Sequence, residues 1–304
     1  MTATEADLLS WFDALCNWGR WGDDDRLGTL NLITPEVRRR AAAEVQAGEV
    51  VSCALPIDPR PAADHISGPP QRYMTGTGEG HALRAPDGPR YGGAAEFLGL
   101  SYHGYSVTHL DALSHYFWDG RMYGGRPASL VTSTGGATAL DVAGVDGIVT
   151  RGLLADVPAH RGVPWLEPGE SVGPDELDAM GIRPEPGDAV LLRTGYGRRR
   201  RERGPDRTGE VGRAGWHASC LPWLHEHGVA LIGADTAQDV HPSGYDAFRS
   251  PVHAIGIVAM GLWLIDNCDL EDLAATGRRQ FLLSVAPLRW VGATGSPVNP
   301  LAVL

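Results

Sequence analysis

The spacing of apolar residues along the chain predicts short helices that alternate with short strands. The segment Thr4 to Cys16 repeats apolar residues at helical spacing, which is typical of an amphipathic helix. Thr34 followed by Pro35 is a typical helix start, and Gly48 is a typical end. Further helices are expected at residues 174–180, 216–227, 251–260 and 270–276.

Short, uninterrupted apolar runs predict buried strands between these helices. The expected strands cover residues 50–55, 97–113 (one or two strands), 147–157, 188–194, 229–234, 262–265 and 281–287. Residues 56–93 are rich in glycine and proline and predict a long irregular excursion that covers a pocket or reaches a neighbouring subunit. The basic run 198–203 is expected to be a solvated loop. The pattern therefore predicts one α/β domain over residues 1–304, with an N-terminal helical extension over residues 1–48.

Composition narrows the class of partner. A net charge of −11 argues against binding to nucleic acid or to an anionic membrane surface. The four cysteines lie far apart, without a C-x-x-C pair, so a thiolate zinc site is not expected. The N-terminus has no signal-peptide pattern, and no apolar run reaches the roughly 20 residues of a membrane span. We expect a cytoplasmic protein that acts on a small molecule.

The stretch from Ser106 to His115 holds the densest chemistry in the chain. His109, Asp111 and His115 share the same parity. On a strand, residues i and i+2 point to one face, roughly 7 Å apart, so His109 and Asp111 could bind one cation. On a helix, only Asp111 and His115 would stay adjacent. Neighbouring strand-forming residues favour the strand, although an isolated His-x-Asp is more often an ordinary surface pair.

This stretch resembles the signature H-x-G-T-H-x-D-x-P-x-H of the cyclase family, which includes bacterial kynurenine formamidases and isatin hydrolases. Four other segments are similar to family blocks and follow in the same order. They are residues 21–31 (WGDDDRLGTLN), 186–195 (PGDAVLLRTG), 233–236 (GADT), and 250–253 (SPVH) followed by 264–267 (LIDN). The resemblance runs from about residue 17 to residue 287.

The resemblance implies a swivelling β/β/α architecture, a homodimer or homotetramer, and a divalent metal site that activates water. Carried over by position, His109 and Asp111 match metal ligands, His253 matches either a ligand of a second metal or a residue that supports the ligands, and Asp266 lies nearest to the late acidic ligand. His115 matches the catalytic acid/base.

One position departs from the signature: its first histidine falls at Tyr105. The nearest preceding histidine is His103. This departure favours either a one-metal site or a binuclear site with a substituted ligand.

Imidazole and carboxylate donors suit Zn²⁺ or Mn²⁺, with Asp266 or Gln238 as a further oxygen donor. Such an ion lowers the pKa of water and polarises a carbonyl, and His115, with an ordinary pKa near 6.5, would move the proton. Arg193 and Asp235, at expected strand ends, are candidates for substrate binding, although an ion pair explains Arg193 equally well.

Trp18, Trp21 and Tyr105 are candidates for an aromatic wall around the substrate, and packing is the competing role for the two tryptophans. The leading hypothesis for the chain is a metal-dependent hydrolase of a small amide, lactam or lactone. The alternatives are a cyclase or dehydratase of secondary metabolism that uses the same site, and a non-catalytic small-molecule-binding protein.

Overall fold

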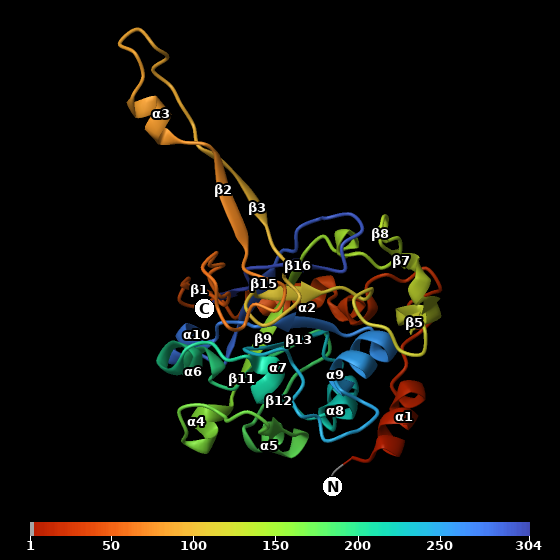
Figure 1. Ribbon diagram of the computed structural model, residues 1–304. Helices are drawn as coiled ribbons and strands as arrows, with labels where there is room; N and C mark the ends of the chain where they lie inside the picture. Colours follow the sequence, from red (N-terminus) through yellow and green to blue (C-terminus); the bar gives the residue numbers. More distant parts are fainter. Residues whose placement is uncertain (1–2) are drawn as a thin grey trace.

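A nine-stranded mixed sheet runs through the protein (Figure 1). The structure is a computed structural model that describes residues 3–304. The strand order is β1-β17-β15-β9-β11-β13-β14-β4-β16. Its parallel centre consists of β9 (Ile148–Asp156), β11 (Ala189–Arg193), β13 (Leu231–Ala234) and β14 (Trp263–Asp266). These strands are buried on both faces, which explains their uninterrupted apolar sequences.

Antiparallel strands extend the sheet on both sides of this centre. One side carries β15 (Gln280–Val285), β17 (Leu301–Val303) and β1 (Val50–Ser52). The other side carries β4 (His109–Asp111), which pairs with both β14 and β16 (Gly295–Pro297). The predicted α/β class is therefore confirmed, and the metal-ligand candidates of the central stretch lie on a strand as expected. Strands β16 and β17 lie beyond the last predicted strand.

Helices cover the sheet. Helix α2 (Pro35–Ala42) starts where the sequence predicts, because the Thr34 hydroxyl accepts a hydrogen bond from the Val37 N–H, and it packs against β9 and β15. Helices α4, α5 and α8 gather on the lower side of the sheet in Figure 1. Besides α2 and the short α3 described below, the α-helices are α1 (Glu5–Ala14), α4 (Val157–Arg161), α5 (Pro174–Ala179), α6 (Tyr196–Arg203), α7 (Thr208–Val211), α8 (Cys220–Glu226), α9 (Pro251–His253) and α10 (Glu271–Ala275). The π-helical segment η5 (Ala254–Met260) continues α9.

Four small two-stranded sheets and several 3₁₀ turns complete the fold. The small sheets pair β10 (Ser171–Val172) with β12 (Gly215–Trp216), β2 with β3, β5 (Arg121–Met122) with β6 (Arg126–Pro127), and β7 (Val131–Thr132) with β8 (Gly136–Ala137). The 3₁₀ turns are η1 (Gly28–Leu32), η2 (Tyr123–Gly125), η3 (Ala128–Leu130) and η4 (Val142–Gly144). Among the described residues, no helix has both the length and the apolar character needed to cross a bilayer.

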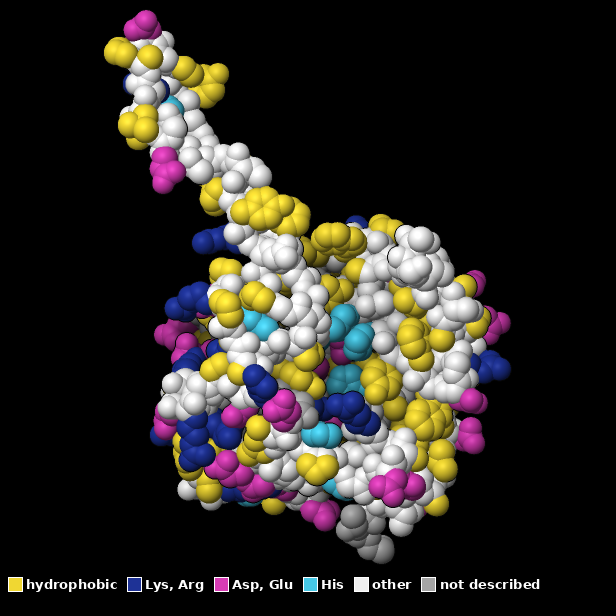
Figure 2. All heavy atoms as spheres, viewed as in Figure 1, with side chains coloured by type: hydrophobic (Ala, Val, Ile, Leu, Met, Phe, Trp, Pro, Cys, Tyr) yellow, Lys and Arg dark blue, Asp and Glu magenta, His cyan; other side chains and the backbone are white. Residues whose placement is uncertain are grey.

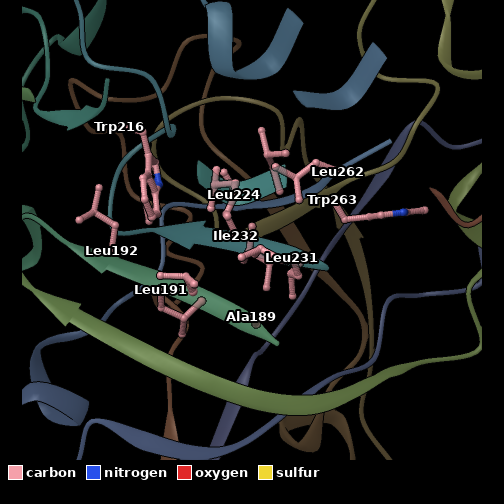
Figure 3. Close-up of a cluster of buried hydrophobic side chains, with 14 of the residues drawn as sticks. Ala189, Leu191, Leu192, Trp216, Leu224, Leu231, Ile232, Leu262 and Trp263 are labelled. Atoms are coloured by element: carbon pink, nitrogen blue, oxygen red, sulfur yellow. The ribbon is translucent and has the colours of Figure 1, made fainter. Parts of the chain in front are cut away.

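A dense apolar core supports the centre of the sheet (Figure 3). Leu191 of β11 and Ile232 of β13 are fully buried, as are Trp216 and Trp263. Each side chain of this size contributes about 2 kcal/mol when it leaves water. The Trp263 indole N–H also donates to the carbonyl of Leu27, which ties the N-terminal segment to β14. The strands that carry polar groups at their ends therefore rest on a rigid base.

The segment predicted as an irregular excursion instead forms a projecting arm (Figure 1). Strands β2 (Gln71–Gly76) and β3 (Ala95–Gly99) make an antiparallel hairpin, with α3 (Gly78–Ala82) near its tip. Tyr73 stacks on Phe97 with ring centroids 4.8 Å apart, and both rings are exposed. The prediction missed β2 and included only residues 97–99 of β3, within the strands expected over residues 97–113, because neither face of the hairpin packs on the core.

The basic run 198–203 was also predicted wrongly, since it belongs to helix α6. Its arginines are held by carboxylates from distant segments: Arg200 pairs with Asp64 at 2.7 Å, and Arg201 pairs with Asp269 at 2.5 Å. The helix therefore packs through ion pairs rather than through an apolar stripe, and the apolar pattern gave no signal for it.

Candidate metal centre

Strands β4 and β14 bring three of the predicted ligands to one face of the sheet. His109 and Asp111 alternate along β4, and His109 Nε2 lies 3.5 Å from Asp111 Oδ1. Asp266 is the direct cross-strand partner of His109, so both side chains share a face. Asp266 Oδ2 lies 3.9 Å from His109 Nε2. All three residues are buried.

The carboxylate of Asp111 lies at the centre of four imidazoles. His103 Nδ1 is 3.0 Å and His115 Nε2 is 3.8 Å from its Oδ1. His109 Nε2 approaches the same oxygen, and His253 Nε2 lies 3.6 Å from Oδ2. Nevertheless, neither Asp111 oxygen accepts a well-aligned hydrogen bond. In Figure 2, histidine side chains gather in a hollow at the foot of the arm, with arginine side chains directly beside them.

The ligand atoms form two groups that share Asp111. One group is His103, His109 and Asp111; the other is Asp111, His253 and Asp266. Within each group, the candidate ligand atoms all lie within 4.8 Å of one another. A buried carboxylate with two unpartnered oxygens is costly unless a cation or a proton neutralises it. This donor set therefore fits one or two divalent ions, and Asp111 would belong to the ligand group of either.

Hydrogen bonds fix the orientation of two of the imidazoles. His109 Nδ1 lies 2.9 Å from the Val107 carbonyl, which can only accept, so Nδ1 donates there and Nε2 faces Asp111 and Asp266. His253 Nδ1 lies 2.5 Å from Asp239 Oδ2, while the Val252 N–H donates to Oδ1 of the same carboxylate. Support of this kind on the far ring nitrogen is a regular feature of metal-binding histidines.

The electrostatics of the cluster favour a cation. Burial opposes the charged form of Asp111, but His115, His103 and His253 outweigh it and hold the pKa of Asp111 well below its usual range. Burial likewise opposes a charged His253, yet the nearby carboxylates of Asp111, Asp239 and Asp266 raise its pKa well above 6.5. The carboxylates thus draw a proton onto His253, in the position that a metal ion could take.

His115 lies just past the end of β4, as predicted, but in a different electrostatic setting. Its ring stacks on that of His103, with centroids 3.8 Å apart. Burial, reinforced by the neighbouring imidazoles, lowers the pKa of His115 to about 4 rather than leaving it near 6.5. His115 is therefore a neutral imidazole at pH 7 and is able to accept a proton.

His103 is the one ligand candidate that we did not assign from the sequence. It lies in the loop after β3, and its Nε2 lies 3.0 Å from the Thr294 hydroxyl. The sequence did hold one signal: Tyr105 stands where the signature has its first histidine, and His103 lies two residues before it. Only the path of the loop turns His103 toward Asp111.

Gln238 supports the cluster through its side-chain nitrogen, while its Oε1 is buried without a hydrogen-bond partner among the described residues, so its role as an oxygen donor stays a prediction. Its side-chain amide donates to the Ile265 carbonyl at 2.7 Å and to Asp266 Oδ1 at 2.9 Å. This second bond leaves Asp266 Oδ2 to face His109 and His253. Asp266, although offset by one position from the family spacing, is thus oriented as a ligand would be.

Arg193 and Asp235 lie at their predicted strand ends but have structural partners. Arg193 pairs with Asp156 at 2.6 Å and with Glu271 at 2.7 Å. The Asp235 carboxylate accepts hydrogen bonds from the backbone and hydroxyl of Thr194 and from the next two backbone N–H groups. Their role in substrate binding stays a prediction, and none of these contacts supports it.

The hydrogen bonds and cation–π contacts of the three aromatic candidates involve residues outside the imidazole cluster. Trp18 donates its indole N–H to the Val258 carbonyl, and Trp21 lies under Arg20, so the contacts of both are packing contacts. Tyr105 lies in the loop that joins His103 to β4, close to Arg213. A residue that the sequence did not suggest lies closer: the ring of Tyr116 is 5.5 Å from that of His253.

Comparison with known proteins shows the family of the chain. The family model "Putative cyclase" matches residues 56–238, which include His109, Asp111 and His115. A crystal structure described as a novel cyclase is 30% identical, covers 96% of this chain and 99% of its own, and has a TM-score of 0.83. The chain therefore belongs to the cyclase family, and its mixed sheet with helices is the cyclase-like fold.

Two further structures share the fold at lower identity. An isatin hydrolase bound to the product analogue thioisatinate is 19% identical with a TM-score of 0.59, over 86% of this chain and 94% of its own. Isatin hydrolase A from Ralstonia solanacearum is 20% identical with a TM-score of 0.59, and the match covers 88% of this chain and 97% of its own. No curated protein matches the sequence.

Proposed function

We propose that this chain is a metal-dependent hydrolase that opens a small amide, lactam or lactone. The observation that carries the proposal is Asp111, a buried carboxylate that accepts no hydrogen bond although four imidazole nitrogens lie within 4 Å of it. Membership of the cyclase family, and the fold shared with isatin hydrolases, support the same reaction class.

The residues that would hold a metal are His103, His109 and Asp111 on one side, and Asp111, His253 and Asp266 on the other. Imidazole and carboxylate donors of this kind suit Zn²⁺ or Mn²⁺. An ion bound there lowers the pKa of water toward about 7 and polarises a carbonyl oxygen. Asp239 and Gln238 keep His253 and Asp266 aimed at that position.

His115 is the proposed acid/base. Its lowered pKa keeps it neutral before reaction, so it can take a proton from the attacking water. The positive charge that develops on the ring then lies beside the Asp111 carboxylate, 3.8 Å away. His115 next gives the proton to the leaving nitrogen or oxygen. Stacking on His103 holds the ring in place during both transfers.

The test of this proposal is elemental analysis of the purified protein, followed by a screen of aryl formamides, isatin-like lactams and lactones. We expect one or two equivalents of Zn²⁺ or Mn²⁺ per chain. His109→Ala should lose both metal and turnover, and His115→Ala should keep its metal and lose turnover. Unchanged metal content in His109→Ala would contradict the assignment.

A cyclase or dehydratase reaction at the same site is the second candidate. Leu113, where the family signature has proline, and Tyr105, where it has histidine, favour a reshaped pocket. Turnover in water enriched in oxygen-18 separates the two reactions, because only hydrolysis puts solvent oxygen into the product. A pure, metal-free protein without activity after metal addition would instead indicate a non-catalytic binding protein.

The arm supports the proposal that the chain assembles as a homodimer or homotetramer. An isolated two-stranded hairpin is at best marginally stable in water. Met74, Leu98 and Tyr91 are 46%, 63% and 85% exposed along it, although apolar surface of this kind is normally covered. Light scattering of the full chain, compared with a variant that lacks residues 72–98, tests whether the arm holds subunits together.

A further inference from the structure

Four arginine side chains are buried among the described residues, and three of them pair with carboxylates. Arg151 pairs with Asp188, Arg193 with Asp156 and Glu271, and Arg199 with Asp206 and Glu167. Arg213 is the exception: it is 8% exposed, and no carboxylate oxygen of the described chain lies within 4 Å of it. A buried guanidinium without a counter-ion is costly, so its presence needs a reason.

Arg213 lies beside the candidate metal centre. Its Nε donates to the Asp239 carbonyl at 2.8 Å, and the carboxylate of that same Asp239 holds His253. Its Nη1 lies 3.4 Å from the Tyr105 hydroxyl, and its guanidinium carbon lies 5.5 Å from the centre of the Tyr105 ring. These contacts use Nε and one N–H of Nη1 and leave Nη2 without a hydrogen-bond partner among the described residues.

Two more basic side chains lie close to Arg213. His241 forms a β-bridge with Arg213, and its Nδ1 is buried without a hydrogen-bond partner. Burial, together with the positive charges of Arg213 and Arg249, lowers the pKa of His241. Arg249 is exposed and makes no ion pair within the described chain, and it precedes His253 by four positions. The lowered pKa favours a neutral His241, which can donate a hydrogen bond, while Arg213 and Arg249, whose charges both act on its ring, supply the positive charge.

We propose that Arg213, assisted by Arg249 and His241, binds a carboxylate of the substrate, so that the substrate of this site is an anionic small molecule. The proposal rests on the hydrolase function proposed above and names its substrate class. The substrate's carboxylate pairs with Arg213, while its scissile carbonyl lies at the cluster around Asp111.

The planar guanidinium favours a carboxylate, because Nη2 and the remaining N–H of Nη1 can meet two oxygens of a planar anion. The same contacts account for Tyr105. At the position where the family signature has a histidine, this chain has a tyrosine that contacts Arg213, and His103 faces Asp111 in its place. With His103 in place of the signature histidine, four imidazoles still face Asp111, and Tyr105 is free to orient Arg213.

The experiment compares wild type with Arg213→Gln on a matched pair of substrates, 4-carboxyformanilide and its methyl ester. For wild type we expect kcat/KM to be higher for the carboxylate. Arg213→Gln should lose roughly 10- to 100-fold with the carboxylate, the range for one charge-assisted hydrogen bond, and change little with the ester. Its metal content should equal that of wild type. Arg39→Gln, which removes an exposed arginine on α2, is the matched control and should change neither value.

A binding measurement keeps the two proposals separate. Titration calorimetry with benzoate on the metal-loaded protein should show the same roughly 10- to 100-fold loss of affinity in Arg213→Gln. Benzoate bound only to the metal would be insensitive to this change, and equal affinity would overturn the subsite. If wild type cleaves neither formanilide nor any other compound of the screen, the hydrolase proposal fails, and the benzoate titration still decides the anion subsite.

Two further variants guard against misfolding of Arg213→Gln. Arg213→Lys keeps the charge and should retain part of the preference for the carboxylate. Arg249→Gln changes an exposed residue and should weaken benzoate binding by a smaller factor, about threefold for an exposed charge pair. Equal losses on both substrates together with loss of metal would show that Arg213 supports the metal centre instead, and would overturn the proposal.

Discussion

Asp111 and Asp235 are both buried aspartates of the same sheet, yet their surroundings are opposite. Asp235, at the end of β13, accepts four hydrogen bonds of 2.7–3.0 Å. Asp111, on β4, accepts none of acceptable geometry and faces imidazoles. The same contrast separates Arg193, with two carboxylate partners, from Arg213, with none within residues 3–304. A buried charge with protein partners holds the fold together, whereas one without partners implies a ligand from outside.

The largest expected effect tests the unpartnered aspartate. Asp111→Asn should lose bound metal and at least about 1,000-fold in kcat, because the shared ligand is gone, while the protein stays folded. Metal analysis, steady-state kinetics and circular dichroism measure the three properties. Wild-type metal content in this variant would place the metal elsewhere and remove the contrast between the two aspartates.

Asp235→Ala should give the converse result. Three backbone N–H groups and one hydroxyl would lose their acceptor, which costs about 3 kcal/mol of unfolding free energy. Metal content should not change, because Asp235 contacts neither ligand group. Urea denaturation followed by elemental analysis measures both. A loss of metal without a loss of stability would reverse the roles assigned to the two residues.

Arg193→Met should lower the unfolding free energy by about 2 kcal/mol, since Asp156 and Glu271 would remain without their shared partner. KM should stay within about twofold of wild type, whereas Arg213→Gln should change it for an anionic substrate. The comparison of the two variants separates a structural arginine from a substrate-binding one. A large KM effect in Arg193→Met would revive its predicted role in substrate binding.

The smallest effect concerns pH. Burial raises the pKa of Asp235 to about 6, above the value of 3.8 for a free aspartate, while bonds from Thr194 limit the rise. Between pH 3.8 and about 6, the native state therefore carries a proton on Asp235 that the unfolded state lacks. The stability from this group is complete below pH 3.8 and is lost as pH rises through about 6. Asp235→Ala should thus be more destabilising at pH 5 than at pH 8, by about 1 kcal/mol, as thermal unfolding at both values can measure.

Local patterns were enough for much of the fold. Thr34 and Pro35 marked the start of α2, and the run at residues 188–194 marked β11, because capping and continuous burial leave signals within a few residues. The arm and helix α6 gave no such signal. Their side chains meet solvent or distant carboxylates, so the apolar periodicity that identifies an element was absent from both.

The same division holds within the site. The sequence by itself determined that His109 and Asp111 share one face of a strand, because alternation is a local property of extended backbone. Only the tertiary structure decided that Asp266 lies opposite His109, that a loop turns His103 toward Asp111, and that Arg213 is buried without a counter-ion. Strand pairing, the path of a loop and the absence of a counter-ion for Arg213 depend on residues far apart in the chain, so they cannot be predicted from a local sequence pattern.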